Sequence, residues 1–336
     1  MAVRRRAIVQ RNKDDPLDGG LELVHLDAYH APPPGHVCVR LTHRPINPSD
    51  HNSISMGRLF NLEQTPPIPG CEGCGLVHEV GEGVSKVRVG ERVVPLIFLD
   101  YYKTGNGSWQ DFITLRQSHI LQLPAALSDE VAAQSILNPW TAYGLLADSA
   151  VPPGEFLLQT AAASVLGRQV IQLARHLGIK TINIVRRDKW ISELKALGAD
   201  EVINSEKQDI VAEVKAITMG RLAYGAIDAV GGDLTKSVAS CVRSDGTIYV
   251  YGVLSGWNIS LSTLDLMRGV RIRWWLLSNY LRNETKVDDT AVQVMTLLTN
   301  KILTPLPGKS FPLENFGEAL RESKKEARGG KIMLVG

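Results

Sequence analysis

Two cysteines, Cys71 and Cys74, lie three residues apart in the glycine-rich stretch IPGCEGCG at residues 68–75. A Cys-x-x-Cys pair is typical of half a zinc site or of a redox-active dithiol. The other cysteines, Cys38 and Cys241, are too scattered to complete a zinc site. A redox pair needs a helix N-terminus to lower the thiol pKa, and no helix is predicted here. We therefore expect no metal and no dithiol, with Cys74 as small packing and the glycines forming a turn.

The stretch QTAAASVLG at residues 159–167 could bind the phosphates of a nucleotide. It joins a predicted apolar strand to a predicted helix, and residues 161–164 are small enough for backbone amides to approach a pyrophosphate. The helix N-terminus adds a partial positive charge. Only Gly167 remains of the G-x-G-x-x-G fingerprint, so a structural turn without a ligand is the alternative interpretation.

Two arginines, Arg186 and Arg187, follow the next predicted strand in INIVRRDK. An NAD-binding unit usually places Asp or Glu there, about 20 residues after the turn, to bind the ribose hydroxyls. A carboxylate would repel a 2′-phosphate, whereas a guanidinium binds it through paired hydrogen bonds. The arginines therefore favour NADPH, although two solvated surface arginines would give the same pattern.

The bulk composition sets the size and class of the protein. With 336 residues the chain is long enough for about two domains, and 44% hydrophobic with 21% charged residues is typical of a soluble globular protein. A net charge of +2 gives no reason to expect a nucleic-acid or membrane partner. The basic N-terminus lacks the apolar core of a signal peptide. We expect a cytoplasmic protein, and a mitochondrial one only if a transit peptide is missing from this chain.

The pattern of predicted elements divides the chain into two modules. Up to about residue 120, short strands such as HVCVRLTH and GLVHEVG alternate with Gly- and Pro-rich turns, which indicates a β-rich module. From SDEVAAQSILNPWTAYGLLAD onward, helices and strands alternate, which predicts a doubly wound parallel sheet. The final strand GGKIMLVG can return to the first module. We predict an α/β protein with one domain at residues 1–130 and 300–336 and a Rossmann domain at 131–299.

The same segments resemble the medium-chain dehydrogenase/reductase superfamily, and most closely its zinc-independent, mitochondrial-type 2-enoyl thioester reductases. The motifs that carry this resemblance are PINPSDHN (45–52), GCEG (70–73), GEGVSKVRVGERVVP (81–95), NPWTAYGLL (138–146), VIQLARHLGIKTINIVR (170–186), YGVLSG (251–256) and RWWLLSNYL (273–281). The resemblance implies a β-rich GroES-like catalytic domain, a Rossmann domain, an active-site cleft between them and a homodimer.

The resemblance also assigns cofactor contacts by position. It implies NADPH contacts at Asn138, Ala163, Ser164, Val165, Leu166, Arg186, Arg187, Asp188, Tyr251, Gly252, Val253, Leu254, Trp274, Trp275, Leu276 and, less directly, Lys331. Arg186 and Arg187, with Asp188, would take the 2′-phosphate. The segment at Tyr251 follows a predicted Rossmann strand at its carboxyl end, where a cofactor is expected.

Two departures from the family pattern affect the chemistry. The family's general acid is a tyrosine a few residues after NPSD, but this chain has Arg58, Leu59 or Phe60 at that point. General acid catalysis contributes about 10²–10⁴-fold, so its loss puts thioester reduction in doubt. The zinc-binding members of the superfamily use Cys and His where this chain has Asn47 and Cys71. We therefore expect no catalytic zinc.

Candidate catalytic groups remain in each module. Asn47 and Arg58 could polarise a conjugated carbonyl, and Tyr143 lies near the nicotinamide in the family pattern. His51 could act as an acid near neutral pH, although a lone His is more often a packing residue. Trp274 and Trp275 could line an apolar pocket or pack in the core.

Three functions follow from these features. The first is an NADPH-dependent reductase of activated C=C bonds, most closely a trans-2-enoyl thioester reductase. The second is an NADPH:quinone or 2-alkenal reductase, which needs no deep acyl pocket. The third is a catalytically weakened NADPH-binding sensor or partner subunit, as the lost tyrosine and loop glycines would allow. The expected partners are a small-molecule substrate (enoyl thioester, enone or quinone) and a second copy of the chain.

Overall fold

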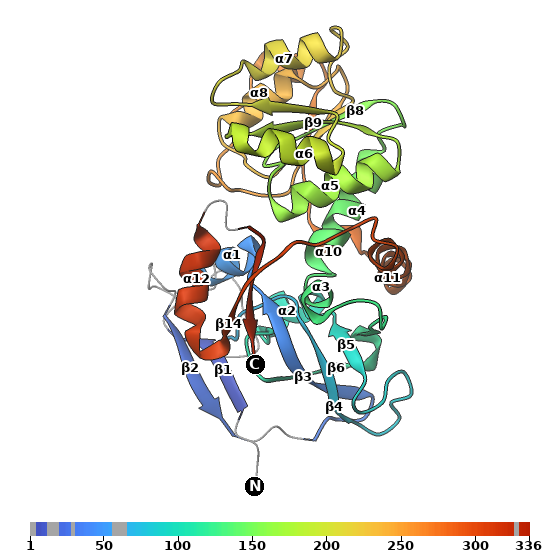
Figure 1. Cartoon of the computed structure of the whole chain (residues 1–336), viewed down its shortest axis with the longest axis vertical. Coiled ribbons are helices and arrows are strands. Elements are labelled where there is room, and N and C mark those ends of the chain that lie inside the picture. Colours follow the sequence, from blue (N-terminus) through green and yellow to red (C-terminus); the bar gives the residue numbers. More distant parts are fainter. Residues whose placement is uncertain (1–4, 12–19, 28–30, 56–65, 326–328) are drawn as a thin grey trace. The chain divides into compact units, whose positions relative to one another are not determined.

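The computed structural model describes residues 5–11, 20–27, 31–55, 66–325 and 329–336 (Figure 1). The chain forms two compact units, Met1–Leu137 with Pro305–Gly336, and Asn138–Thr304. We predicted these divisions at residues 130 and 299. The second falls later because the backbone N–H of Thr304 donates to the Gln172 side chain, 3.1 Å away, which holds residues 300–304 to the second unit.

The first unit is built on strands. Its elements are β1 (Arg5–Gln10), β2 (Leu21–Leu26), β3 (His36–Pro45), α1 (Pro48–Ser55), β4 (Cys74–Val80), β5 (Arg92–Pro95), α2 (Phe98–Thr104), β6 (Phe112–Arg116), β7 (Ile120–Gln122), α3 (Asp129–Ala133), β14 (Pro307–Pro312), α12 (Phe316–Lys324) and β15 (Lys331–Val335). Seven strands form one sheet in the order β14-β15-β3-β4-β5-β7, with β6 also paired to β3, and β1 pairs with β2. This sheet confirms the predicted β-rich module.

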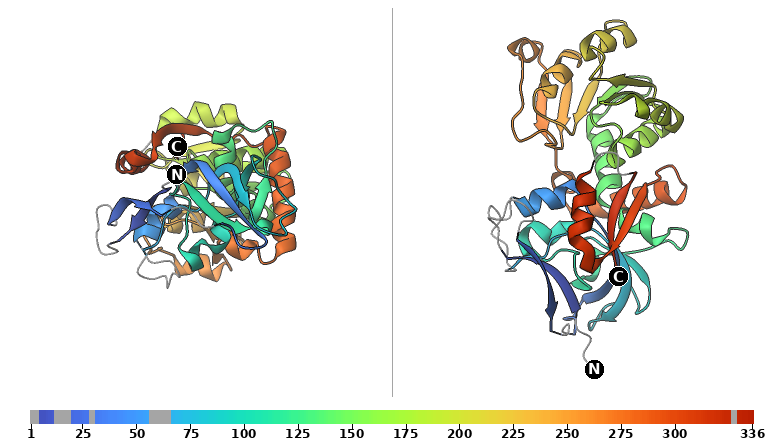
Figure 2. Two further views of the ribbon diagram at one scale, coloured as in Figure 1. Left: turned by 90° about the horizontal axis from the view of Figure 1, so that it is seen from below. Right: turned by 60° about the vertical axis from the view of Figure 1, so that its left-hand side comes forward.

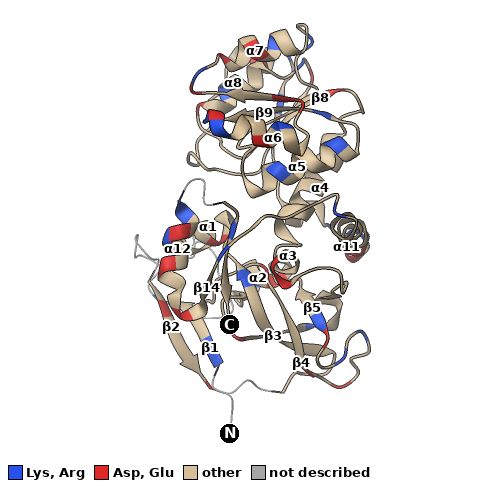
Figure 3. Cartoon of the chain, viewed as in Figure 1, with Lys and Arg blue, Asp and Glu red and all other residues tan. Residues whose placement is uncertain are grey.

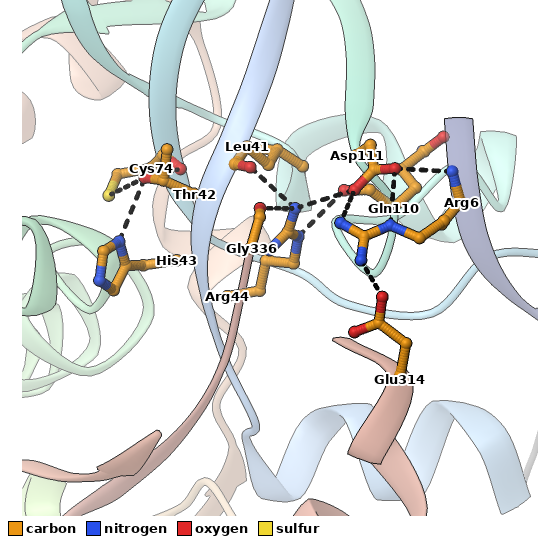
Figure 4. Close-up of polar contacts among 10 residues, drawn as sticks. All are labelled: Arg6, Leu41, Thr42, His43, Arg44, Cys74, Gln110, Asp111, Glu314 and Gly336. Atoms are coloured by element: carbon orange, nitrogen blue, oxygen red, sulfur yellow. Dashed lines mark hydrogen bonds and ion pairs between the residues drawn. The ribbon is translucent and has the colours of Figure 1, made fainter. Parts of the chain in front are cut away.

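The last strand returns to the first unit, as the sequence predicted. β15 pairs antiparallel with β3 and parallel with β14, and Figure 2 shows the red C-terminal segment among the blue strands. The buried Arg44 guanidinium holds the C-terminal residue against the first unit by hydrogen bonds (Figure 4). It donates to the carbonyl oxygens of Leu41 at 2.8 Å, Gln110 at 2.9 Å and Gly336 at 3.3 Å. Burial lowers the pKa of Arg44 to about 10.

The second unit is a doubly wound parallel sheet. Its elements are α4 (Leu137–Ser149), β8 (Phe156–Gln159), α5 (Val165–His176), β9 (Lys180–Val185), α6 (Ile191–Leu197), β10 (Glu201–Asn204), α7 (Ile210–Ile217), β11 (Gly225–Asp228), α8 (Leu234–Ser240), β12 (Thr247–Val250), α9 (Thr263–Met267), β13 (Arg271–Trp274), α10 (Leu277–Tyr280) and α11 (Glu284–Thr299). The strand order is β10-β9-β8-β11-β12-β13, all pairs parallel. The predicted Rossmann topology is therefore confirmed.

Two local differences from the sequence pattern have simple causes. The helical stretch after Ser128 is two helices, α3 and α4, because Pro139 lacks an N–H and is tolerated only in the first turn of a helix. The stretch ERVVPLIF, read as one strand, ends as a strand at Pro95. Phe98 begins α2, which buries Phe98 and Tyr101 on one face.

Basic and acidic residues are interspersed over both units in the view of Figure 3. In the part of the chain that the structure describes, no helix combines the length and apolar character needed to span a membrane.

Candidate functional site

Four residues of the first unit, Asn47, Asp50, Glu72 and Lys331, form a fully buried polar group that we name the Asn47 cluster. Asn47 follows β3, and its Nδ2 donates to Glu72 Oε1 at 3.0 Å. Its Oδ1 accepts from Lys331 Nζ at 2.5 Å. The second Glu72 oxygen accepts the backbone N–H of Leu137 at 2.9 Å, at the start of α4. The cluster thus ties the PINPSD and GCEG motifs, the last strand and Leu137 together within the first unit.

Burial makes it unfavourable for the two carboxyl groups of the Asn47 cluster to carry their negative charges. Burial raises the pKa of Asp50 to about 6, and hydrogen bonds from Asn47 and Cys71 oppose the shift. Burial also raises the pKa of Glu72 above its usual value, and the Lys331 charge acts in the opposite direction. Because two carboxylates share one buried ammonium, the charge state of this cluster depends on all three groups.

The IPGCEGCG turn is held by Asp50. The backbone N–H of Cys71 donates to Asp50 Oδ1 at 3.1 Å, and the Asp50 carboxylate also accepts the backbone N–H of Asn47 at 2.7 Å. Cys71 is buried, and burial raises its thiol pKa well above the usual value. Cys74 begins β4, and its Sγ lies 3.8 Å from Thr42 Oγ1 (Figure 4). Both environments disfavour the thiolate that a redox pair or metal ligand needs.

Close packing explains why a glycine begins this turn. Gly70 has φ +101°, and a Cβ at this position would lie 2.3 Å from Ser108 Oγ and 2.4 Å from Trp109 Cδ1. Among the residues that the structure describes, no three His, Cys, Asp or Glu side chains come together where they could hold a metal ion.

A hydroxyl that the sequence could not place lies beside this turn. Tyr102, on α2, places its hydroxyl near Cys71 and Ser53. Tyr102 remains 43% exposed, and the neighbouring Cys71 together with burial raises the pKa of its hydroxyl. A protonated hydroxyl at this place can donate a hydrogen bond. Tyr101 and Tyr102 are adjacent in sequence but differ in burial. Neighbouring residues of a helix point in different directions, so α2 buries Tyr101 in the core and leaves Tyr102 partly exposed.

The QTAAASVLG turn of the second unit, predicted to bind a pyrophosphate, joins β8 to the capped start of α5. Ser164 caps α5 by accepting the N–H of Gly167 at 3.0 Å. Gly167 packs so closely that a Cβ would lie 2.6 Å from the Ala162 carbonyl oxygen. Ala161 adopts φ +50°, in the left-handed region that glycine usually occupies. One position of this turn therefore has the backbone conformation that glycine usually adopts, although the residue there is an alanine under strain.

The remaining residues of this turn are partly exposed at the start of α5. Ala163, Val165 and Leu166 are half-buried, and Ser164 is exposed. Thr160 Oγ1 donates to Asp228 Oδ1 at 2.7 Å, which joins the turn to the end of β11. The predicted pyrophosphate contacts thus lie together at the carboxyl edge of the sheet.

The predicted 2′-phosphate residues lie at the end of β9. Arg186 and Arg187 are both exposed. Asp188 begins a 3-10 helix (Asp188–Trp190), and its carboxylate accepts Asn204 Nδ2 at 2.5 Å and pairs with Lys207. Sequence reasoning did not anticipate Lys207, whose only signal is its place just after β10.

Residues after β12 complete the same edge of the second unit. Gly252 packs on the end of β11, since a Cβ there would lie 2.6 Å from the Ala229 carbonyl oxygen. Val253 is half-buried and Leu254 is 60% exposed. The Tyr251 hydroxyl and Asn138 Nδ2 are buried without a hydrogen-bond partner within the described ranges. Such atoms are expected where a polar ligand completes the site.

The two tryptophans differ in role. Trp275 is buried, and its Nε1 donates to Asp148 Oδ2 at 2.7 Å. It also packs on Gly144, where an added Cβ would lie 2.7 Å from its ring. Trp274 and Leu276 are 47% and 41% exposed. Trp275 thus packs within the second unit, Trp274 and Leu276 are accessible, and all three stay predicted cofactor contacts.

The other candidates are distributed between the units. Tyr143, on α4, is half-buried, and burial raises its pKa. His51 in α1 contacts Ser323 Oγ through Nε2 at 2.8 Å, which gives it a packing contact with α12. Lys331, a predicted cofactor contact, is engaged by Asn47 in the first unit. Arg58 lies outside the described residues.

The second unit fits a nicotinamide dinucleotide. Its capped helix N-terminus, close-packed glycines and the unpartnered Tyr251 hydroxyl lie at the edge where doubly wound sheets bind such cofactors. When bound, the cofactor would supply a hydride.

Comparison with known proteins agrees with this arrangement. Residues 33–125 match the alcohol dehydrogenase GroES-like domain family, and residues 165–290 match the zinc-binding dehydrogenase family. The chain is 31% identical to the mitochondrial enoyl-[acyl-carrier-protein] reductase of Xenopus tropicalis, over 98% of this chain and 95% of that protein. It is also 31% identical to that of Dictyostelium discoideum, over 89% of this chain and 85% of the relative.

Solved structures resemble the chain over its whole length. A quinone oxidoreductase from Pseudomonas syringae has a TM-score of 0.86 and 26% identity, covering 99% of this chain and all 100% of its own. The quinone oxidoreductase of Escherichia coli in complex with NADPH has a TM-score of 0.87 at 24% identity, with coverage of 99% and 100%. The second likeness, at this identity, concerns the fold alone.

The fold and both sets of matches define an oxidoreductase of the medium-chain dehydrogenase/reductase superfamily that uses a nicotinamide cofactor. Within that superfamily the chain belongs to the zinc-independent family that includes the mitochondrial enoyl-[acyl-carrier-protein] reductases. The resemblance drawn from the sequence motifs is thereby confirmed.

Proposed function

We propose that this protein is an NADPH-dependent reductase of activated C=C bonds, with a trans-2-enoyl thioester as its substrate. The observation that carries the cofactor choice is the pair Arg186 and Arg187 at the end of β9, where an NAD-specific unit would place a carboxylate. The substrate class rests on the relatives named enoyl-[acyl-carrier-protein] reductase.

A role for Asn47 in this reaction follows from its hydrogen bonds. Its Nδ2 gives one hydrogen to Glu72, and its Oδ1 is occupied by Lys331. The second Nδ2 hydrogen is the group that can bind the carbonyl oxygen of a conjugated substrate as charge develops there. Glu72 and Lys331 fix the amide so that its nitrogen, rather than its oxygen, is the available end.

A quinone or 2-alkenal reductase is the second candidate function. The solved structures that match the chain over its length include a quinone oxidoreductase at 26% identity. The region where the family carries its acid tyrosine has none in this sequence. Reduction of a quinone needs no acid placed to protonate a carbon atom, because the protons go to oxygen atoms and water can supply them.

The experiment that separates these functions is a substrate panel. NADPH and NADH oxidation is followed by absorbance with a crotonyl-type thioester, a quinone and an alkenal. We expect turnover of the thioester with NADPH and much slower turnover with NADH. Quinone turnover alone would select the second function. NADPH binding without turnover of any substrate would leave a cofactor-binding sensor or partner subunit.

We also propose that the protein is a homodimer that uses the free edge of the second unit's sheet. Strand β13 is the terminal strand of that sheet. The N–H of Arg271 donates to the carbonyl oxygen of Gly246, just before β12, at 2.9 Å, and that of Trp275 donates to Val250 of β12 at 2.8 Å. Alternation along the strand then turns the backbone groups of Ile272 and Trp274 to the open edge. Next to it, α9 exposes Leu264 and Met267 at 69% and 83%. A second copy could cover these groups by a two-fold pairing.

The dimer is tested by adding acidic side chains to this surface. The double variant Leu264→Glu/Met267→Glu is expected to convert a dimer into monomers, since like charges would meet across the two-fold axis. Light scattering coupled to size exclusion measures the mass. The matched control is Met219→Glu, whose methionine is 81% exposed elsewhere in the same unit. A monomeric wild type, or a double variant with the mass of the dimer, would contradict the proposal.

A further inference from the structure

The ends of two neighbouring strands bring a third basic residue to the predicted 2′-phosphate position. β9 and β10 are parallel neighbours, with Val185 opposite Asn204. Ser205 continues this contact, because its backbone N–H donates to the Val185 carbonyl oxygen at 2.9 Å. The turn at residues 205–207 therefore lies beside the segment that begins with Arg186.

The turn is fixed by Asn204, whose side chain is 2% exposed. Its Oδ1 accepts the backbone N–H of Glu206 at 3.0 Å, so its Nδ2 must point the other way. That nitrogen donates to Asp188 Oδ1 at 2.5 Å. The other Asp188 oxygen pairs with Lys207 Nζ. One carboxylate is thus held between a buried amide and an exposed ammonium.

This arrangement resolves an electrostatic conflict in the sequence. A carboxylate two residues after Arg186 would repel a 2′-phosphate, which carries up to two negative charges. The Lys207 ammonium and the Asn204 amide occupy both Asp188 oxygens, and the pKa of Asp188 is lowered by Lys207 first and Asn204 second. The carboxylate therefore stays charged but is compensated locally.

We propose that Lys207 is a specificity-determining residue for NADPH, whose ammonium neutralises Asp188 and binds the 2′-phosphate together with Arg186 and Arg187. The inference rests on the proposed NADPH dependence and extends it to a residue on a different strand end. Asp188 then acts through Lys207 as a positioning residue and makes no direct contact with the phosphate. Without Lys207, the same carboxylate would accept a hydrogen bond from the free ribose 2′-hydroxyl of NADH.

Because Lys207 and Asp188 are exposed, effects of their substitution on cofactor binding can be separated from effects on folding. Lys207 and Asp188 side chains are 66% and 51% exposed, and such pairs add little to folding stability. A variant at Lys207 is therefore expected to fold normally. The matched control is Lys195→Ala, because Lys195 is also exposed and paired, at 3.0 Å to Glu201, but at the opposite end of β10.

The experiment measures Kd of NADPH and of NADH by fluorescence titration, without substrate. Lys207→Ala is expected to raise Kd for NADPH about tenfold, as loss of one charged phosphate contact does. Kd for NADH should stay within about twofold or fall, because NADH has no 2′-phosphate with which Lys207 could form a charged hydrogen bond. Adding Asp188→Asn to Lys207→Ala should restore part of the NADPH affinity, because the uncompensated charge is removed. Lys195→Ala should change neither Kd.

The outcomes separate this inference from the proposed cofactor preference. If Arg186→Ala weakens NADPH selectively but Lys207→Ala leaves it unchanged, the role of Lys207 is overturned and NADPH dependence stands. Equal weakening of both cofactors by Lys207→Ala would show a structural role only and would also overturn it. A wild type that binds NADH as tightly as NADPH would overturn both proposals.

Discussion

Replacing Lys331 by methionine is expected to lower the free energy of unfolding of the first unit by about 3–5 kcal/mol, as breaking a buried ion group does. Lys331 is 2% exposed, and its ammonium binds Asn47 Oδ1 beside Glu72. Methionine fills similar volume but removes the ammonium charge that favours the ionised forms of Asp50 and Glu72. The loss therefore comes from uncompensated charge rather than from a cavity.

The pH dependence of this loss distinguishes charge from packing. The folded-state pKa of Asp50 is about 6, above its unfolded value, and that of Glu72 is raised in the same direction. The folded protein therefore binds more protons, and the stability these groups contribute at low pH is lost as pH rises from about 4 through about 6. Without Lys331 the carboxyl pKa values rise further, so the deficit of the variant should be larger at pH 8 than at pH 5.

Hydrogen exchange of the β3–β15 ladder measures this unit alone, and urea unfolding at the two pH values gives the free energy. Lys309→Met is the matched control, because Lys309 is 66% exposed and paired with Glu322 in the same unit. It should cost less than about 1 kcal/mol, as exposed pairs do. A Lys331→Met deficit that is small, or equal at both pH values, would exclude the electrostatic role.

The second large effect is expected at the cofactor. Arg186→Ala should raise Kd for NADPH by about 10- to 100-fold, because a bidentate guanidinium–phosphate contact is among the strongest hydrogen-bonded pairs. Both arginines are exposed, so the fold should not suffer. The double variant Arg186→Ala/Arg187→Ala should show the larger loss, with Kd for NADH nearly unchanged.

Affinity is measured by titrating each cofactor at two salt concentrations. The wild-type NADPH affinity should fall more steeply with salt than that of the double variant, because screening weakens charge–phosphate attraction. Arg175→Ala is a suitable control, since this arginine lies in the last turn of α5, at the opposite end of the helix from Ser164. Equal weakening of NADPH and NADH would remove the assignment of these arginines to the 2′-phosphate.

Much of the fold follows from local sequence alone. The strand that ends at Val185 and the helix that begins after Ser164 are set by apolar periodicity and by a capping side chain, both of which act within a few residues. Tertiary context explains the misread elements. Pro139 lies in the first turn of α4, so the predicted single helix is two helices. The apolar run after Pro95 forms α2 instead of continuing the strand, because its buried residues fall on one helical face.

The candidate sites divide in the same way. The sequence determined the superfamily, the parallel sheet and the two arginines after β9, since each depends on short motifs or on periodicity. Only the tertiary structure decided that Asn47, Glu72 and Lys331 form one buried cluster, and that Lys207 neutralises Asp188. These contacts join residues 284, 25 and 19 positions apart. Pairings of that kind depend on strand register and burial, which no local pattern encodes.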